Sequence, residues 1–307
     1  MKPAWSVILL TTLIGTGQGL FLAAFAVDIL RPGSAKELVL TSCVVSLLLL
    51  ACGLVASFFH LGRPERAWRA ASQWRTSWLS REVIVLPAFM VAVVMYGFLS
   101  FISFERSFLL FAGAVGGILC LALFVCTGMI YACLKFLQEW HTPLTLLNYL
   151  LLGTASGFTL SVPVAVIAYP QFAGVLALAA FCVGALAYLS RCASLVRNAR
   201  LRPKSTPATA IGVDHPRIVQ KAQGFMGGSF NTREFFHGRP QIVLRAARWT
   251  FLILAFPVPG LLLGWGGGSL PAFVAAFAIQ FAGLLAERWY FFAEARHPQN
   301  LYYQSMA

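Results

Sequence analysis

The chain has 307 residues, of which 59% are hydrophobic and only 11% are charged, and its formal net charge is +13. Soluble globular domains carry about 25% charged residues, so the composition excludes an ordinary water-soluble protein and predicts an integral membrane protein. No stacking platform or groove-reading element accompanies the basic residues, so the charge does not indicate a nucleic-acid partner.

Apolar runs of about 20 residues, the length that crosses the hydrocarbon core of a bilayer, recur along the whole chain. We place eight of them near residues 5–28, 38–60, 82–103, 107–134, 143–168, 172–190, 242–263 and 270–290. The runs do not alternate apolar with polar residues, which predicts an all-α helical bundle rather than a β-barrel. The first run is too long for the apolar region of a cleaved signal peptide. We therefore expect residues 1–307 to form one polytopic membrane domain.

Gln18 is a polar residue inside the first apolar run, within the segment Gly15-Thr16-Gly17-Gln18-Gly19. An amide in lipid needs a hydrogen-bond partner. Gly15 and Gly19 are four residues apart, which lets a neighbouring helix approach closely. Two interpretations follow: the segment serves helix packing, or Gln18 lines a ligand cleft.

The segment between the second and third runs combines a His, a Glu, several Arg and several Trp. It reads His60-Leu61-Gly62-Arg63-Pro64-Glu65-Arg66-Ala67-Trp68, then Trp74-Arg75-Thr76-Ser77-Trp78-Leu79-Ser80-Arg81-Glu82. We expect His60 and Glu82 at the same depth, near the membrane surface. A quinone ring needs hydrogen bonds to its two oxygens and a group that exchanges protons near neutral pH. A His has this property, and a partly buried Glu can acquire it.

Each of these two residues also has a structural interpretation. His60 can be a helix C-terminal residue that the helix dipole favours, and Glu82, following Ser80, can belong to the first turn of the third helix. Their occurrence together in one short segment favours function.

The long polar segment at about 191–241 is predicted to be a loop. Its part from Gly224 to Gly238 contains four Phe and a Met, whereas disordered segments are poor in such residues. We interpret it as an ordered surface that docks a partner subunit. Tyr131 and Trp140 fit an aromatic belt at the membrane interface, and Asn148 and Tyr149 are too isolated to interpret.

The distribution of basic residues predicts the orientation. With eight spans, one set of extramembrane segments comprises the N-terminus, 61–81, 135–142, 191–241 and the C-terminus. The opposite set carries only Arg31, Lys36 and Arg106 of the 23 Lys and Arg. The positive-inside rule then places both termini in the cytoplasm.

Metal and haem sites are not indicated. The seven cysteines form no C-x-x-C cluster and are interpreted as small buried hydrophobes. A transmembrane pair of bis-His haems would need imidazoles within the bundle. All five histidines lie on or near the basic side: His60, His141, His215, His237 and His297. We expect no metal and no haem in this chain. The alternative of one haem near the basic side stays open.

The pattern His60-Leu61-Gly62-x-Pro64-x-Arg66-Ala67 followed by Leu79-Ser80-x-Glu82 resembles the DMSO reductase anchor family, DmsC, within the wider NrfD-like anchors. The eight-span layout is similar as well, and the pair Glu287-Arg288 resembles the terminal helix of these anchors. The resemblance implies a membrane subunit that binds a quinone, ubiquinone or menaquinone. Its partners would be an iron–sulfur subunit and a molybdopterin catalytic subunit. It also implies that His60 and Glu82 form the quinone site, with Arg66 as a third member.

One feature departs from the DMSO reductase anchors, which present this loop to the periplasm, whereas the charge distribution places it in the cytoplasm. The segments Trp74–Glu82 and Arg296–Tyr303 resemble the anchors of membrane-bound sulfite dehydrogenases, whose catalytic subunits are cytoplasmic. The resemblance implies a bacterial inner-membrane protein that passes electrons from such partners to quinone. Three alternatives stay open: a quinol-oxidising anchor of the DMSO reductase type, a structural anchor, and a transporter, against which the lack of a clear mid-membrane charge counts.

Overall fold

The computed structural model describes residues 3–33, 35–59, 61–202, 206–219, 221–222, 241–265 and 267–297. Within these ranges the regular structure is helical, with no strand. Eight helical spans are long and apolar enough to cross a membrane. The predicted all-α polytopic bundle is confirmed.

Most of the spans are built on one continuous α-helix, and the seventh is broken. The first six are α1 (Trp5–Leu30), α2 (Lys36–Phe58), α3 (Trp78–Phe101), α4 (Arg106–Ala132), α5 (Pro143–Ala168) and α6 (Ala173–Ala199). The seventh consists of α9 (Gln241–Leu254) and α10 (Pro257–Trp265), and the last is α11 (Leu270–Glu294). The break precedes Pro257, which has no amide hydrogen to continue the helical ladder. Short elements are η1 (Pro64–Gln73), η2 (Pro170–Phe172) and α7 (Pro207–Ile211).

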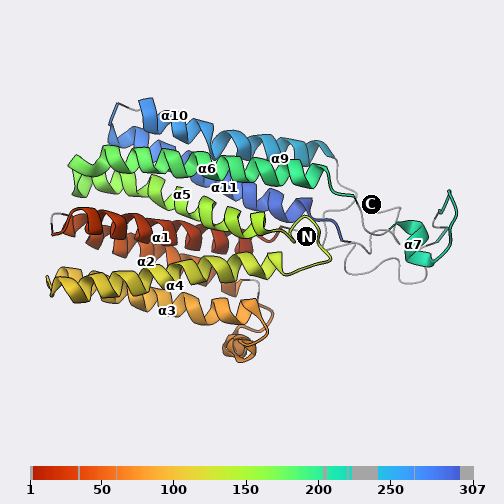
Figure 1. Ribbon diagram of the computed structural model, residues 1–307, viewed down its shortest axis with the longest axis horizontal. Coiled ribbons are helices and arrows are strands. Elements are labelled where there is room, and N and C mark those ends of the chain that lie inside the picture. The colour runs from red at the N-terminus through yellow and green to blue at the C-terminus, as the bar shows by residue number, and fades with distance from the viewer. Residues whose placement is uncertain are drawn as a thin grey trace.

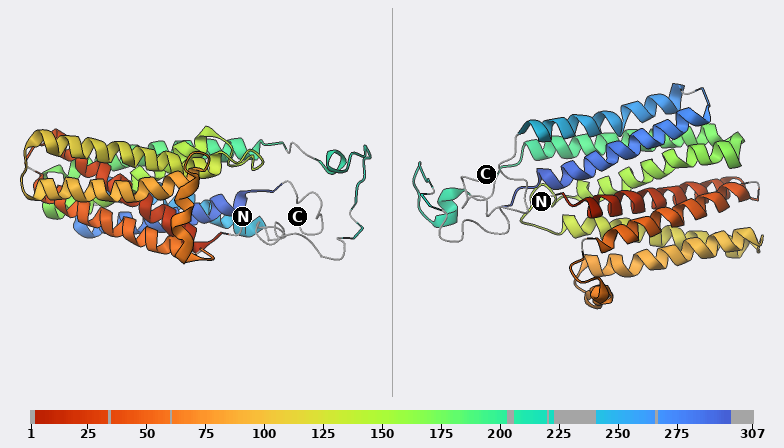
Figure 2. Two further views of the ribbon diagram at one scale, coloured as in Figure 1. Left: turned by 90° about the horizontal axis from the view of Figure 1, so that it is seen from below. Right: turned by 180° about the vertical axis from the view of Figure 1, so that it is seen from behind.

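Successive spans run in opposite directions, so the connecting segments gather at the two ends of the bundle (Figure 1). One end carries residues 3–4, η1, the α4–α5 connection at 133–142, the C-terminal end of α6 and residues 295–297. We call this the basic end. Figure 2 shows the same arrangement from below and from behind. The grouping agrees with the set of segments that the sequence predicted to lie together.

The helices α1 and α5 form the centre of the bundle and are the two most buried spans. Glycines bring them into backbone contact: a Cβ on Gly19 would clash with the carbonyl oxygen of Gly153, and one on Gly157 would clash with the backbone of Leu20. Such close approach needs small residues on both helices. The packing interpretation of the glycine-rich segment in α1 is therefore confirmed.

Two predictions from the sequence are wrong at the basic end. The helix α6 does not stop near 190 but continues to Ala199, because Arg191 and Ser194 are buried against neighbouring helices instead of facing water. Tyr131 and Trp140 do not form an interfacial belt. Trp140 is 2% exposed, and its indole nitrogen donates to the carbonyl oxygen of Phe291 at 3.1 Å.

The remainder of the predicted loop is only partly described. Residues 203–205, 220 and 223–240 lie outside the described ranges, and the Phe-rich segment 224–238 falls among them. Its role as a docking surface stays a prediction.

Candidate functional site

A narrow pocket lies among α1, α3, α4, α5 and α11. Its polar lining consists of Thr11, Thr12, Gln18, Glu82, Thr127, Tyr149, Ser156 and Arg288. Glu82 is four residues into α3, about 6 Å from its first residue, and Gln18 is thirteen residues into α1, about 20 Å from its start. Because both helices begin at the basic end, the pocket extends from near that end toward the middle of the bilayer.

Glu82 is placed in the pocket by the start of α3. The hydroxyl of Ser77 caps this helix by accepting from the backbone N–H of Ser80 at 3.3 Å. The helix therefore begins at Trp78, and Glu82 falls in its second turn instead of the first. Its side chain is buried and accepts a hydrogen bond from the hydroxyl of Thr127 on α4. A buried carboxyl with one neutral hydrogen-bond partner is costly to keep ionised without further donors, so this group is chemically suited to exchange a proton.

Gln18 combines the two roles that the sequence left open. Its Nε2 donates to the carbonyl oxygen of Cys120 on α4 at 2.8 Å, which ties α1 to α4. The same side chain lines the pocket. Ser156 of α5 also lines this pocket, and its hydroxyl lies within hydrogen-bonding distance of the Thr16 hydroxyl, at 2.9 Å.

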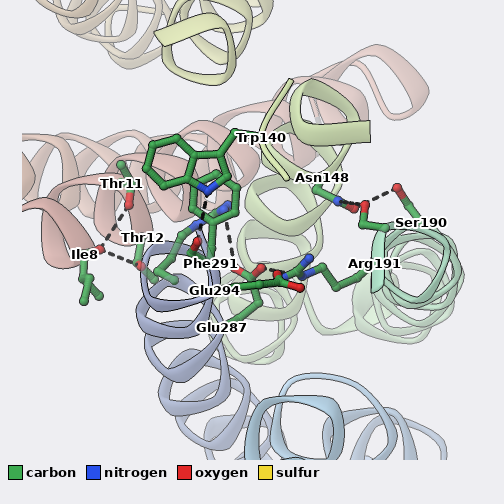
Figure 3. A network of polar contacts seen from close by, with 12 residues as sticks. Ile8, Thr11, Thr12, Trp140, Asn148, Ser190, Arg191, Glu287, Phe291 and Glu294 are labelled. Atoms are coloured by element: carbon green, nitrogen blue, oxygen red, sulfur yellow. Dashed lines mark hydrogen bonds and ion pairs between the residues drawn. The ribbon is translucent and has the colours of Figure 1, made fainter. Parts of the chain in front are cut away.

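Arg288 brings a positive charge to the pocket. The sequence indicated it as a basic residue of a helix end and, with Glu287, as part of the family resemblance, but not as a site residue. Its guanidinium lies 3.8 Å from the ring centroid of Tyr149 and 3.4 Å from a carboxylate oxygen of Glu287. The other oxygen of Glu287 is 2.7 Å from Nε of Arg191. Arg191 and Glu287 are 2% and 1% exposed, respectively, so this ion pair is fully inside the bundle. Figure 3 shows Arg191 directed at Glu287 and Glu294.

Asn148 and Tyr149 also belong to this polar region. The Asn148 amide donates to Ser194 at 2.7 Å and its oxygen accepts from Ser190 at 2.8 Å (Figure 3). A signal for Asn148 was present in the sequence. Ser190, Arg191 and Ser194 share one face of a helix at spacings of three and four, and such a face inside an apolar bundle needs polar partners on a neighbouring span.

The structure brings together only part of the predicted site. Gln18 and Glu82 line one pocket. Arg66 lies on η1 with its side chain 51% exposed, 3.9 Å from the carboxylate of Glu65, and it does not line the pocket. His60 lies outside the described residues, so its place in the site stays a prediction. Within the described ranges, no three His, Cys, Asp or Glu side chains form a group that could hold a metal ion.

The fold and the pocket define a polytopic membrane protein with a buried polar site near its basic end. A family model described as "DMSO reductase anchor subunit (DmsC)" matches residues 1–221, which is well over half of the chain. The chain is also 55% identical, over 330 aligned positions that cover 100% of both proteins, to a sulfite dehydrogenase subunit of Allochromatium vinosum. The chain therefore belongs to the DMSO reductase anchor family.

Proposed function

We propose that this chain is the quinone-reactive membrane anchor of a sulfite dehydrogenase complex in the bacterial inner membrane. The observation that carries the proposal is the convergence of Gln18, Glu82 and Arg288 on one buried pocket near the basic end. Family membership supports the anchor role, and the similarity to the sulfite dehydrogenase protein of Allochromatium vinosum supports the kind of complex.

The pocket residues fit the chemistry of a quinone ring, which takes up two electrons and two protons when it is reduced. Arg288 offers guanidinium donors to a ring oxygen and favours negative charge there. Glu82 holds or releases a proton at its carboxyl, oriented by Thr127. We assign to His60 a hydrogen bond to the second ring oxygen and proton exchange. We assign to Arg66, which is exposed on η1, the role of holding charge near the partner protein.

The pocket is narrow, so a ring must spread the side chains that line it. The break between α9 and α10 removes part of the backbone ladder beside α11. We infer that α11, which lines the pocket and packs on this broken span, is the helix that adjusts to the ring. The electrons come from the iron–sulfur subunit, docked at the basic end, which links the molybdopterin subunit to the pocket. The positive-inside distribution supports a cytoplasmic location for these partners.

The carboxyl of Glu82 provides the direct test. In the complex purified with its partners, Glu82→Gln keeps the shape of the side chain and removes its ionisable proton. We expect the reduction of a short-chain ubiquinone analogue by sulfite to fall by about 10²-fold or more, the contribution typical of a positioned proton-transfer group. Reduction of a soluble dye, which bypasses the membrane site, should keep its wild-type rate.

The matched control is Glu105→Gln, which changes an exposed carboxylate at the opposite end of the bundle. It should leave both rates unchanged. Undiminished quinone reduction in an intact Glu82→Gln complex would show that the pocket is not the quinone site.

A transporter is the alternative that the structure addresses most directly. Buried charges do occur within the spans, which the sequence did not reveal, since Arg191, Glu287 and Arg288 are all buried. Glu287 is seven residues before the end of α11, about 10 Å from the basic end. Transporter sites lie near the bilayer midplane, so the position of this cluster favours exchange with one face only.

A further inference from the structure

A second pocket lies between the first pocket and the basic end of the bundle. Its lining includes Glu139, Asn148, Tyr149, Arg191, Glu287 and Arg288. Tyr149 and Arg288 also line the first pocket, so the two pockets meet at this pair of side chains. The second pocket therefore lies between the lining of the first pocket, which includes Glu82, and the α4–α5 connection, which contributes Glu139.

Glu139 is the acidic residue that this connection contributes. It lies between the end of α4 at Ala132 and the start of α5 at Pro143, outside the membrane spans, and its side chain is half-buried. Burial raises the pKa of the Glu139 carboxyl above its ordinary value, while Arg296 and Arg197 nearby oppose the shift. A carboxyl with a raised pKa exchanges protons closer to neutral pH than an exposed one does.

The surfaces of the second pocket carry buried polar atoms without hydrogen-bond partners. Among the described residues, one carboxylate oxygen of Glu287 and Nη2 of Arg191 are held only by ion pairs, at 3.4 Å to Arg288 and at 3.9 Å to Glu294, and make no hydrogen bond. Buried polar atoms in proteins are normally hydrogen-bonded to protein or to water. A polar pocket that offers several such atoms is suited to hold bridging water.

We propose that the second pocket is the proton route that supplies the quinone site, with Glu139 as the group that takes up protons at the basic end. This inference rests on the proposed function, because it assigns the source of the protons that the first pocket consumes. Each reduction of a quinone to a quinol takes two electrons from the partner proteins and two protons from water at this end. The protons pass from Glu139 through water in the second pocket, beside Tyr149, to Glu82.

The ion cluster has a positioning role in this route. Arg191 and Arg288 do not release protons in proteins, so they are not carriers. Arg191 contacts Glu287 at 2.7 Å and Glu294 at 3.9 Å, and Arg288 contacts Glu287 at 3.4 Å. The three salt bridges hold in place the side chains of Arg191, Glu287 and Arg288 that line the second pocket.

The test compares Glu139→Gln with Glu65→Gln in the complete complex. Glu65 is also at the basic end, but its side chain is 67% exposed and lies in neither pocket. For Glu139→Gln we expect the turnover of a short-chain ubiquinone analogue to fall about tenfold, less than for a group that donates directly to a substrate. The KM for the analogue and the dye-linked rate should stay unchanged.

A solvent isotope measurement separates proton supply from structure. In Glu139→Gln the ratio of the rates in H₂O and D₂O should rise above that of the wild type, because proton delivery then limits turnover. Glu139→Asp should restore the rate in part, and Glu65→Gln should behave as the wild type. A carboxyl that only anchored Arg197 and Arg296 would leave the isotope effect unchanged.

The outcomes distinguish the two proposals. Wild-type turnover in Glu139→Gln, or a slower rate with an unchanged isotope effect, would overturn the proton route and leave the quinone site standing. A wild-type complex that reduces dye with sulfite but never reduces the quinone analogue would overturn both.

Discussion

Two clusters of buried charged residues occupy opposite ends of the bundle. The contacts around each cluster indicate a structural role for Asp28 with Arg106 and a functional role for Arg191 with Glu287. At the opposite end of the bundle, the carboxylate of Asp28 accepts hydrogen bonds from the hydroxyl of Tyr96 and from a guanidinium nitrogen of Arg106, both at 2.7 Å. A second nitrogen of Arg106 donates to the backbone oxygen of Asp28 at 2.7 Å. Both carboxylate oxygens have partners, and Asp28 lines neither pocket. In the cluster of Arg191 and Glu287, by contrast, one carboxylate oxygen of Glu287 and Nη2 of Arg191 make ion pairs but no hydrogen bond, and both residues line a pocket.

At the residue scale, His60 carries the prediction that depends most on the family pattern. His60→Ala should leave the complex assembled, because the loss of a single imidazole removes little packing. Quinone turnover should fall by a factor of about 10²–10⁴, the usual effect of removing a positioned proton-transfer group. The measurement is sulfite-dependent quinone reduction beside the dye-linked rate. If quinone reduction persists in an intact complex, His60 has only a helix-end role and the site depends on Glu82 and Gln18.

At the element scale, the spans were predictable because hydropathy records what each side chain does in lipid. The boundaries of α6 were not, since a buried Arg looks the same in a sequence as a solvated one. Arg191 is helical and inside the bundle because Glu287, nearly one hundred residues away, is opposite it. Contacts with residues distant in sequence also explain why Tyr131 and Trp140 are buried in the bundle instead of forming the predicted interfacial belt. Their rings pack at 5.3 Å on each other, and Trp140 also pairs with Phe291 of α11, a contact that no local pattern contains.

The pocket was predictable only in part for a related reason. Gln18 and Glu82 are conspicuous as polar groups beside or within apolar runs, and the structure places both in one pocket. Tyr149 and Arg288 became recognisable only when α5 and α11 were brought together. A ligand site made from five helices is set by tertiary contacts, which the spacing within any single helix does not determine.

The contact of α1 with α5 gives a prediction at the scale of elements. Gly157→Ala adds a Cβ that meets the backbone of Leu20, and overpacking of this kind costs about 1–3 kcal/mol. We expect a lower melting temperature in detergent and slower quinone turnover, because Gln18 and Ser156 line the pocket from these two helices. Gly184→Ala is the control, since a Cβ there meets nothing within 4 Å. Equal melting temperatures for the two variants would show that the helices separate at little cost.

At the scale of the whole molecule, both pockets and the connecting segments that carry most of the basic residues lie toward the same end of the bundle. The two proposals together assign proton uptake, electron delivery and partner docking to this one face. The complex then needs no charge transfer across the full bilayer, and the opposite end, with Asp28 and Arg106, serves to hold the helices together. The arrangement predicts quinone reduction without proton pumping.

The orientation of this face is the last prediction, and it decides where the catalytic partners are. Among the basic residues that the structure describes, only Arg31, Lys36 and Arg106 fall at the far end, so the positive-inside rule places the basic end in the cytoplasm. A reporter active only in the periplasm should be silent when fused after Ala307 and active when inserted near Gly33 or Glu105. Fusions with a reporter active only in the cytoplasm provide the control and should show the reverse. A periplasmic signal from the fusion after Ala307 would place both pockets on the periplasmic side. The sulfite dehydrogenase assignment would then give way to a periplasm-facing complex of the DMSO reductase type.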